Sequence, residues 1–185
     1  MWAVLFVALL LQVWTAVTGY PSGAPVGRCE DMTPQHNVQP QSIPSPYTIV
    51  ISNMTFSTNQ IINVTIQGPQ YIGLLLQARS GSDTNAVGTW KTPPANTKYL
   101  ACSGNNFSAI THSDRTPKDN KTTFSWIPPA SLKTAFITAT VVSNRTTFWV
   151  KLKSSTLTGV SGGVADPKMA VTSVLFLTLL MLTVF

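Results

Sequence analysis

Residues 62–79 read INVTIQGPQYIGLLLQAR, and this stretch decides the fold class. Ile62–Ile66 alternates apolar and polar residues, which is the pattern of a β-strand with one buried face. Gly68-Pro69 predicts a turn. Tyr71–Arg79 is an apolar run that ends in a charge, and it predicts a strand at the centre of a sheet. The stretch therefore predicts two β-strands joined by a turn.

The same signals recur outward from this stretch, and no segment between the chain ends carries a convincing 3.6-residue stripe. Turn signals at roughly 8–12-residue spacing predict an all-β fold, and we expect an immunoglobulin-like antiparallel β-sandwich. Three tryptophans are interpreted as packing residues, with an aromatic ligand platform as the alternative: Trp90, Trp126 and Trp149. The other strands are expected at Tyr47–Ser52, Val87–Trp90, Tyr99–Cys102, Phe107–His112, Thr122–Ile127, Ala135–Val142 and Thr147–Lys153, with a hairpin loop at Ser143–Thr146.

The N-terminus predicts export from the cell. Trp2–Val17 is almost uninterrupted apolar sequence, and small residues follow near Ala16–Gly19. We interpret residues 1–19 as a helical secretory signal peptide that is cleaved after Gly19, which makes Tyr20 the mature N-terminus. The alternative is a signal-anchor helix, but the run falls short of the ~20 apolar residues that a membrane span needs.

The C-terminus predicts a membrane anchor. Small residues at Ser161 and Gly162 precede a short spacer and the apolar tail Met169–Phe185. This order is typical of a glycolipid (GPI) signal, with Ser161 or Gly162 as candidate attachment residues and residues 156–168 as a linker. The rival is a transmembrane helix over 169–185, and a core helix is the third reading. The expected location is the extracellular face of the plasma membrane, with secretion as the alternative.

Two cysteines, Cys29 and Cys102, lie in the exported part. An oxidising compartment favours a disulfide between them, with two free thiols as the alternative. The long loop that it closes gives roughly 4 kcal/mol of stabilisation in the chain-entropy model. The proline-rich stretch Tyr20–Pro46 is expected to be extended and irregular, and Cys29 would fix it to the domain body.

Five Asn-X-Ser/Thr sequons agree with export and predict a glycoprotein. One of them falls on the polar face of the alternating strand Ile62–Ile66, where a glycan has room. The candidate N-glycosylation sites are Asn53, Asn63, Asn106, Asn120 and Asn144.

The charge pattern and the catalytic inventory predict a binding protein and no enzyme. The formal charge is +6, but lysines and arginines are scattered, so no nucleic-acid partner is expected. Thr111–Asp114 contains the residue types of a hydrolase triad, but neighbours on a strand point to opposite faces. His36 and His112 could be imagined as metal ligands, but their spacing in the sequence matches no metal-binding motif. A hydrogen-bonded histidine at a strand end is favoured, and we expect no metal and no cofactor.

Several motifs in order resemble a reelin (reeler) domain over residues 20–155. They are Tyr20–Pro25, Cys29–His36, Tyr71–Arg79, Val87–Trp90, Cys102, Ala109–Ser113, Phe124–Pro129, Phe136–Val142 and Trp149–Lys151. The resemblance implies an immunoglobulin-like sandwich with one disulfide. Such domains occur in matrix proteins, in ferric-chelate-reductase-like membrane proteins and in small insect defence proteins, so the family alone does not fix a function.

The expected function is binding by a membrane-tethered extracellular glycoprotein. Its partner would be another protein, a matrix glycan or a microbial surface. The first alternative is an innate-immune, antimicrobial defence protein. Single-domain defence proteins of this kind are typically secreted without an anchor, so the C-terminal tail distinguishes this chain from them. The second alternative is an accessory ectodomain related to ferric-chelate-reductase-like proteins, without redox activity of its own.

Overall fold

The computed structural model describes residues 19–160, and in it the alternating stretch forms strand β3 (Ile62–Gln67). Ile62, Val64 and Ile66 are buried, while Asn63 is exposed, as the alternation predicts. β3 lies between β1 (Thr48–Ile51) and β8 (Thr123–Ile127), and β5 (Thr89–Trp90) completes a four-stranded sheet in the order β1-β3-β8-β5. All pairings in this smaller sheet are antiparallel.

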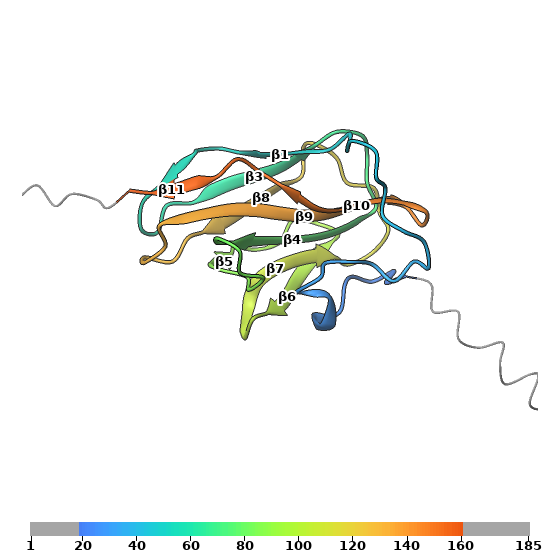
Figure 1. The fold of residues 1–185 in the computed structure, drawn as a ribbon, viewed down its shortest axis with the longest axis horizontal. Coiled ribbons are helices and arrows are strands. Elements are labelled where there is room, and N and C mark those ends of the chain that lie inside the picture. Colours follow the sequence, from blue (N-terminus) through green and yellow to red (C-terminus); the bar gives the residue numbers. More distant parts are fainter. Residues whose placement is uncertain (1–18, 161–185) are drawn as a thin grey trace, which may run out of the picture.

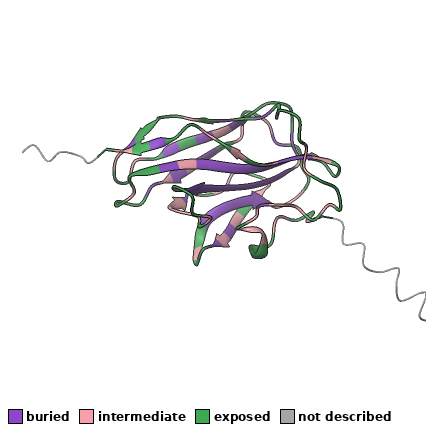
Figure 2. Ribbon diagram, viewed as in Figure 1, coloured by how far each residue is buried: buried purple, intermediate pink, exposed green. Residues whose placement is uncertain are grey.

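The apolar run forms β4 (Gly73–Arg79), in which all seven residues are buried (Figure 2). β4 is the central strand of the larger sheet, with order β2-β11-β9-β4-β7-β6 and with β10 paired to β9 (Figure 1). Its pairings are antiparallel except for that of β11 with β2. The other strands are β2 (Thr55–Phe56), β6 (Thr97–Cys102), β7 (Asn105–His112), β9 (Thr134–Asn144), β10 (Thr147–Lys153) and β11 (Leu157–Gly159).

The main core fills the space between the two sheets and confirms the predicted β-sandwich. Leu74 and Leu76 of β4 belong to it, together with the three predicted packing tryptophans. Each indole N–H donates to a backbone carbonyl: Trp90 to Ser108, Trp126 to Val87 and Trp149 to Ile43. The tryptophans therefore pack as expected, with their one polar group satisfied.

The opposite face of the larger sheet is covered by residues 19–36, which we call the N-terminal cover (Figure 1). The cover contains one 3-10 turn, η2 (Val26–Arg28). The cover and the sheet share a second, smaller apolar cluster, which includes Met32 of the cover and Leu75 and Ala109 of the sheet. The predicted disulfide is present, and it joins Cys29 of the cover to Cys102 of β6 with their Cα atoms 5.6 Å apart.

Buried polar side chains of the sheet bind the backbone of the cover. Gln77 Nε2 donates to the Cys29 carbonyl over 2.9 Å, and the Arg79 guanidinium donates to the same oxygen over 2.6 Å. Thr140 Oγ1 donates to the Met32 carbonyl over 2.6 Å. Because unpaired buried polar groups are costly, these side chains hold the cover on the sheet.

His112, at the end of β7, links the cover to β4. Its Nε2 donates to the Tyr20 carbonyl over 2.8 Å, and its Nδ1 accepts from the Leu74 N–H over 3.1 Å. In this tautomer the imidazole is neutral, and Nδ1 also lies 3.1 Å from the Leu74 carbonyl oxygen. Burial lowers the pKa of His112, and the nearby Lys118 and Lys98 lower it further.

The domain extends further toward the C-terminus than the sequence predicted. The linker was expected to begin at residue 156, which is wrong, because Leu157–Gly159 forms β11 and pairs with β9 and β2. Leu157 is fully buried in the main core. The predictions for residues 1–18, for Ser161 and Gly162 and for the 169–185 tail lie outside the described residues. Within residues 19–160, no helix is long and apolar enough to cross a membrane.

We predict that the double variant Cys29→Ala/Cys102→Ala keeps the sandwich but loosens the cover. The disulfide closes a loop across a sequence separation of 73 residues. Its removal is expected to lower the free energy of unfolding by up to about 4 kcal/mol. Denaturant titration gives that loss, and trypsin cleavage after Arg28 reports the loosening. A loss below about 1 kcal/mol with Arg28 still protected would contradict this account.

We also predict that acidification weakens the fold through histidine. Burial lowers the pKa values of His112 and His36 below the ordinary 6.5. The stability from the neutral rings is therefore complete above about pH 6.5 and is lost as the pH falls through the lowered pKa values. Denaturant titrations at about pH 7.5 and 5.5 should show lower stability at the acid value. The variant His36→Gln/His112→Gln, which removes both histidines of the chain, should lose most of this difference. An unchanged difference would refute the assignment.

Candidate functional site

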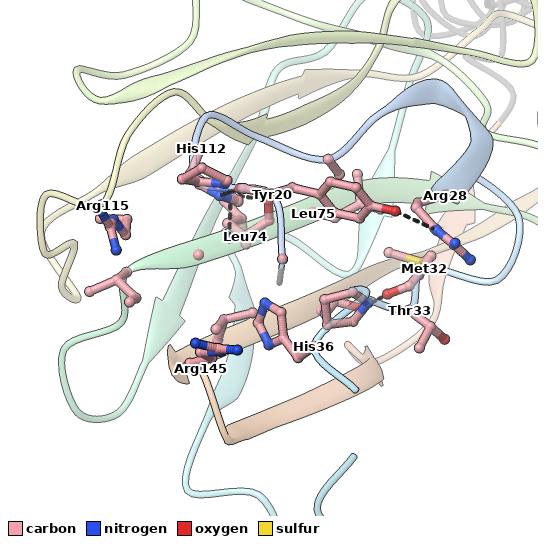
Figure 3. A pocket seen from close by; sticks show the side chains of 18 residues that line it. Tyr20, Arg28, Met32, Thr33, His36, Leu74, Leu75, His112, Arg115 and Arg145 are labelled. Carbon is pink, nitrogen blue, oxygen red and sulfur yellow. Dashed lines mark hydrogen bonds between the residues drawn. The ribbon is translucent and has the colours of Figure 1, made fainter. Parts of the chain in front are cut away.

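A cavity of about 220 Å³ lies between the N-terminal cover and the larger sheet, and we call it the cover pocket (Figure 3). Its lining comes from the cover, from β4 and the residue before it, from the end of β7, from β9, and from the segments that follow β7 and β9. The lining residues are Gly19, Tyr20, Pro21, Ala24, Arg28, Met32, Thr33, Pro34, His36, Ile72, Gly73, Leu74, Leu75, His112, Arg115, Thr140, Val142 and Arg145.

The sheet side of the cover pocket depends on a glycine. Gly73 of β4 pairs with Val142 of β9, and both line the pocket. A Cβ atom at position 73 would lie 2.9 Å from the Val142 Cβ, which is too close for ordinary contact. The neighbouring Leu75 and Thr140 are buried, and the Thr140 hydroxyl donates its hydrogen bond to the Met32 carbonyl. The sheet therefore offers a largely apolar surface here.

One wall is the Tyr20 ring, and its hydroxyl is fully engaged. Tyr20 Oη donates to Gln35 Oε1 over 2.8 Å. It also accepts from Arg28 Nε over 3.1 Å (Figure 3). Arg28 also forms an ion pair with Asp31 at 3.0 Å. The hydrogen bonds from Arg28 to Tyr20 and Asp31 raise the pKa of Arg28. The charge of Arg28 is therefore balanced within the cover itself.

Two further arginines, Arg115 and Arg145, stand on the opposite side of the cover pocket (Figure 3). Arg115 follows β7, and Arg145 lies in the turn between β9 and β10. Both are exposed. Arg28–Asp31 is the only ion pair within residues 19–160, so in that range neither Arg115 nor Arg145 has a carboxylate partner. The cover pocket therefore carries net positive charge on this side.

Hydrogen bonds shape the loops that carry these two arginines. Asp114 accepts from the Thr116 N–H over 2.7 Å, and hydrogen bonding to Thr116 lowers the pKa of Asp114. Lys118 is buried and donates from Nζ to the Thr116 carbonyl over 2.9 Å, while burial lowers its pKa. In the other turn, Asn144 Oδ1 accepts from the Thr146 N–H over 3.0 Å. Hydrogen bonds therefore hold the two turns in which Arg115 and Arg145 lie.

His36 and His112 also line the cover pocket. The His36 ring packs edge-on against Phe148 and beside Gly19, whose φ of +86° and missing Cβ allow the close approach. His36 Nδ1 is buried and has no hydrogen-bond partner within residues 19–160. Burial lowers the pKa of His36, and the positive charge of Arg145 lowers it further, while a hydrogen bond to the Arg145 backbone acts in the opposite direction. At neutral pH the positive charge here comes from the arginines.

The structure places the two histidines in one pocket, but it does not assemble the other sequence candidates. Both His112 nitrogens are engaged by backbone groups, which confirms the hydrogen-bonded histidine at a strand end. Thr111 Oγ1 donates to the Leu74 carbonyl, and Ser113 Oγ donates to Asp114, so no triad forms. Within residues 19–160, no group of three His, Cys, Asp or Glu side chains could hold a metal ion.

The sequons lie outside the cover pocket. All five sequon asparagines are placed at the surface or its edge, which leaves room for glycans, and their occupancy stays a prediction. Asn63 Oδ1 accepts from Ser125 Oγ over 2.9 Å, and this bond is compatible with a glycan on Nδ2. Asn144 directly precedes Arg145, so a glycan there would stand beside the cover pocket.

Sequence reasoning missed the cover pocket as a site. Tyr20, Arg115 and Arg145 are far apart in the chain and match no motif, and two of them look like scattered surface charges. Arg79 ends β4 as expected, but sequence reasoning did not foresee that its side chain is buried and binds the cover. The available signals were the cysteine that fixes the cover and the apolar run at the start of β4.

Comparison with known proteins agrees with this architecture. A protein of Hyphantria cunea named "Putative defense protein Hdd11" is 39% identical over 164 residues, which are 83% of this chain and 96% of that protein. "Putative ferric-chelate reductase 1" of Xenopus laevis is 35% identical over 142 residues, but the match spans 75% of this chain and only 24% of that protein.

Solved structures show the same fold at low identity. The reeler domain of human F-spondin superimposes with a TM-score of 0.52 at 16% identity, covering 66% of this chain and 94% of that one. A second structure, the Reelin-N domain of F-spondin, gives 0.53 at 15% identity, covering 74% and 99%. The Reeler domain family matches residues 27–164, which include most of the cover and all the strands. The chain belongs to the Reeler domain family.

Proposed function

We propose that this protein is an extracellular recognition protein that works by binding, and that the cover pocket is its contact site. The observation that carries the proposal is the pair Arg115 and Arg145 at a preformed cavity, without a carboxylate partner in residues 19–160. Preformed cavities with a few convergent polar groups are where proteins bind small ligands and exposed chemical groups. The partner would be a protein, a matrix glycan or a microbial surface.

The relatives' names favour defence as the second candidate function. The match to the Hyphantria protein extends over nearly the whole length of that protein. In this version, recognition of a microbe through the cover pocket would be the first step of the response. An accessory function beside a ferric-chelate reductase is less favoured, because this chain spans about a quarter of such a relative.

Tethering to a membrane is part of the proposal. The described ends of the chain, Gly19 and Val160, lie toward opposite ends of the long axis (Figure 1). Gly19 lines the cover pocket. An anchor that follows residue 160 would therefore hold the sandwich with the cover pocket directed away from the membrane.

We predict saturable binding of the protein to microbial or matrix surfaces through the cover pocket. The full chain is expressed in cultured eukaryotic cells, and the purified protein is titrated onto bacteria, yeast and immobilised matrix components. The variant Arg115→Gln/Arg145→Gln is expected to bind about tenfold more weakly to the recognised surface, because it loses both unpaired cations. It keeps the Asn144 sequon.

The matched control is Lys121→Gln/Lys133→Gln, which removes the same charge from two exposed positions outside the cover pocket. It is expected to bind like the unmodified protein. Equal weakening in both variants would mean diffuse, salt-screened attraction and would refute the site. Binding to none of the surfaces, at low and physiological salt, would refute the function. Killing of the bound microbe would select defence over recognition alone.

We predict that the protein carries a glycolipid at Ser161 or Gly162. The small residues, the short spacer and the apolar tail together favour this processing. Phosphatidylinositol-specific phospholipase should release the protein from intact cells, and mass spectrometry of the C-terminal peptide should find the glycolipid remnant. Recovery of an intact Met169–Phe185 segment would contradict the prediction and establish a transmembrane anchor.

A further inference from the structure

We propose that the cover pocket binds a small amphipathic carboxylate, with its carboxylate between Arg115 and Arg145 and its apolar body against Leu75 and Met32. This inference rests on the proposed function, because it names the chemical class that the same pocket recognises. The class is defined by one anionic head and an aryl or medium-length alkyl body. Four properties of the cover pocket lead to it.

The first property is the unsatisfied charge at one side. Arg115 and Arg145 line the cover pocket from two separate turns and have no ion-pair partner within residues 19–160. A guanidinium presents planar, paired donors that match a carboxylate. The histidines of the cover pocket add no charge at neutral pH, because burial lowers their pKa values. An anionic group of the ligand is therefore expected at the arginines.

The second property is the apolar character of the other side. Arg28 is paired with Asp31 and Tyr20, so its charge is already balanced there. Met32 and Leu75 are 1% and 3% exposed, and they belong to the same apolar cluster under the cover. Figure 3 shows Arg115 and Arg145 on one side and Tyr20 with Met32 on the other. The cover pocket is therefore polarised, which suits an amphipathic ligand.

The third property is that most polar groups of the cover pocket are occupied: within residues 19–160, His36 Nδ1 is the one buried side-chain nitrogen or oxygen of the lining without a partner. Thr140 Oγ1 donates to the Met32 carbonyl, and Thr33 Oγ1 donates to the Asp31 carbonyl. His112 uses both ring nitrogens on backbone groups. The hydroxyls of a sugar would lose their bonds to water without replacement, at a cost for each unpaired group. A hydrocarbon body loses nothing by entering, so these contacts disfavour a glycan in the interior.

The fourth property is size. The cavity of about 220 Å³ exceeds the roughly 150 Å³ of an engineered apolar cavity that holds benzene. In proportion, it holds about nine non-hydrogen atoms. Octanoate and phenylacetate are of this size. A long acyl chain or a polysaccharide would not be enclosed.

Methyl NMR on the full chain, labelled with ¹³C-methyl methionine, tests the inference with octanoate as the probe. Octanoate is expected to shift the Met32 methyl signal with saturation, and with a Kd of roughly 10 µM to 1 mM. Met54 is 62% exposed and lies outside the cover pocket, so its signal serves as the internal control for unspecific contact with the fatty acid.

Matched ligands and variants test whether both the carboxylate and the alkyl chain of octanoate contribute to binding. Acetate, which has no body, and 1-octanol, which has no charge, should each bind at least about tenfold more weakly than octanoate. Arg115→Gln/Arg145→Gln should weaken octanoate about tenfold, whereas Lys121→Gln/Lys133→Gln should leave its Kd unchanged. Monooctyl phosphate should bind no more tightly than octanoate.

Four outcomes would overturn the inference: a Met32 signal that does not move, Met32 and Met54 signals that move together, octanol that binds as tightly as octanoate, or tighter binding of the phosphate. Any of them, with surface binding still lost in the arginine variant, refutes the ligand class and leaves the proposed function standing. Octanoate bound as expected, with no surface recognised, supports the ligand class and refutes the proposed function.

Discussion

The burial of both faces of β4 is the constraint on which the rest of the structure depends. One face packs into the core between the sheets, and the other carries Gln77 and Arg79, whose buried polar groups need partners. A buried guanidinium without acceptors would cost several kcal/mol, so the sheet is incomplete without the cover. Both side chains donate to the carbonyl of Cys29, the residue that the disulfide joins to β6. The covalent anchor and the polar anchor of the cover therefore meet at one residue.

The cover pocket follows from this uneven anchoring. Around Cys29 and Met32 the cover lies directly on the sheet, but at Gly73 no side chain rises from β4 to fill the space beneath it. His112 fixes the far side of the cover through the Tyr20 carbonyl. A ligand in the cover pocket would contact both the cover and the sheet, so its binding free energy would also stabilise the docked cover. Binding and local stability are linked at this site.

The features that could be predicted from the sequence are those that depend on a local residue pattern or on the cellular compartment. Alternation located β3, the apolar run located β4, and the export signal made the Cys29–Cys102 disulfide the natural expectation. Sequence reasoning missed β2 and β11, because two or three residues carry no measurable period and form strands only through their partners. It also missed the cover pocket, since Arg115 and Arg145 come together through the return of separate strands to one end of a sheet. Such a site is a property of topology, which no short motif encodes.

Export and the cover pocket are connected through the N-terminus. Cleavage after Gly19, as the sequence predicts, would free the α-amino group of Tyr20, whose own carbonyl is held by His112 at 2.8 Å. An α-amino group has an ordinary pKa of about 7.7–8.0, so much of it would be charged at neutral pH. The peptide N–H of Tyr20, which lines the cover pocket, would thereby become a cation in addition to Arg115 and Arg145. The cover pocket would then reach its full positive charge only after the chain has been exported, on the side of the membrane where an external ligand can meet it.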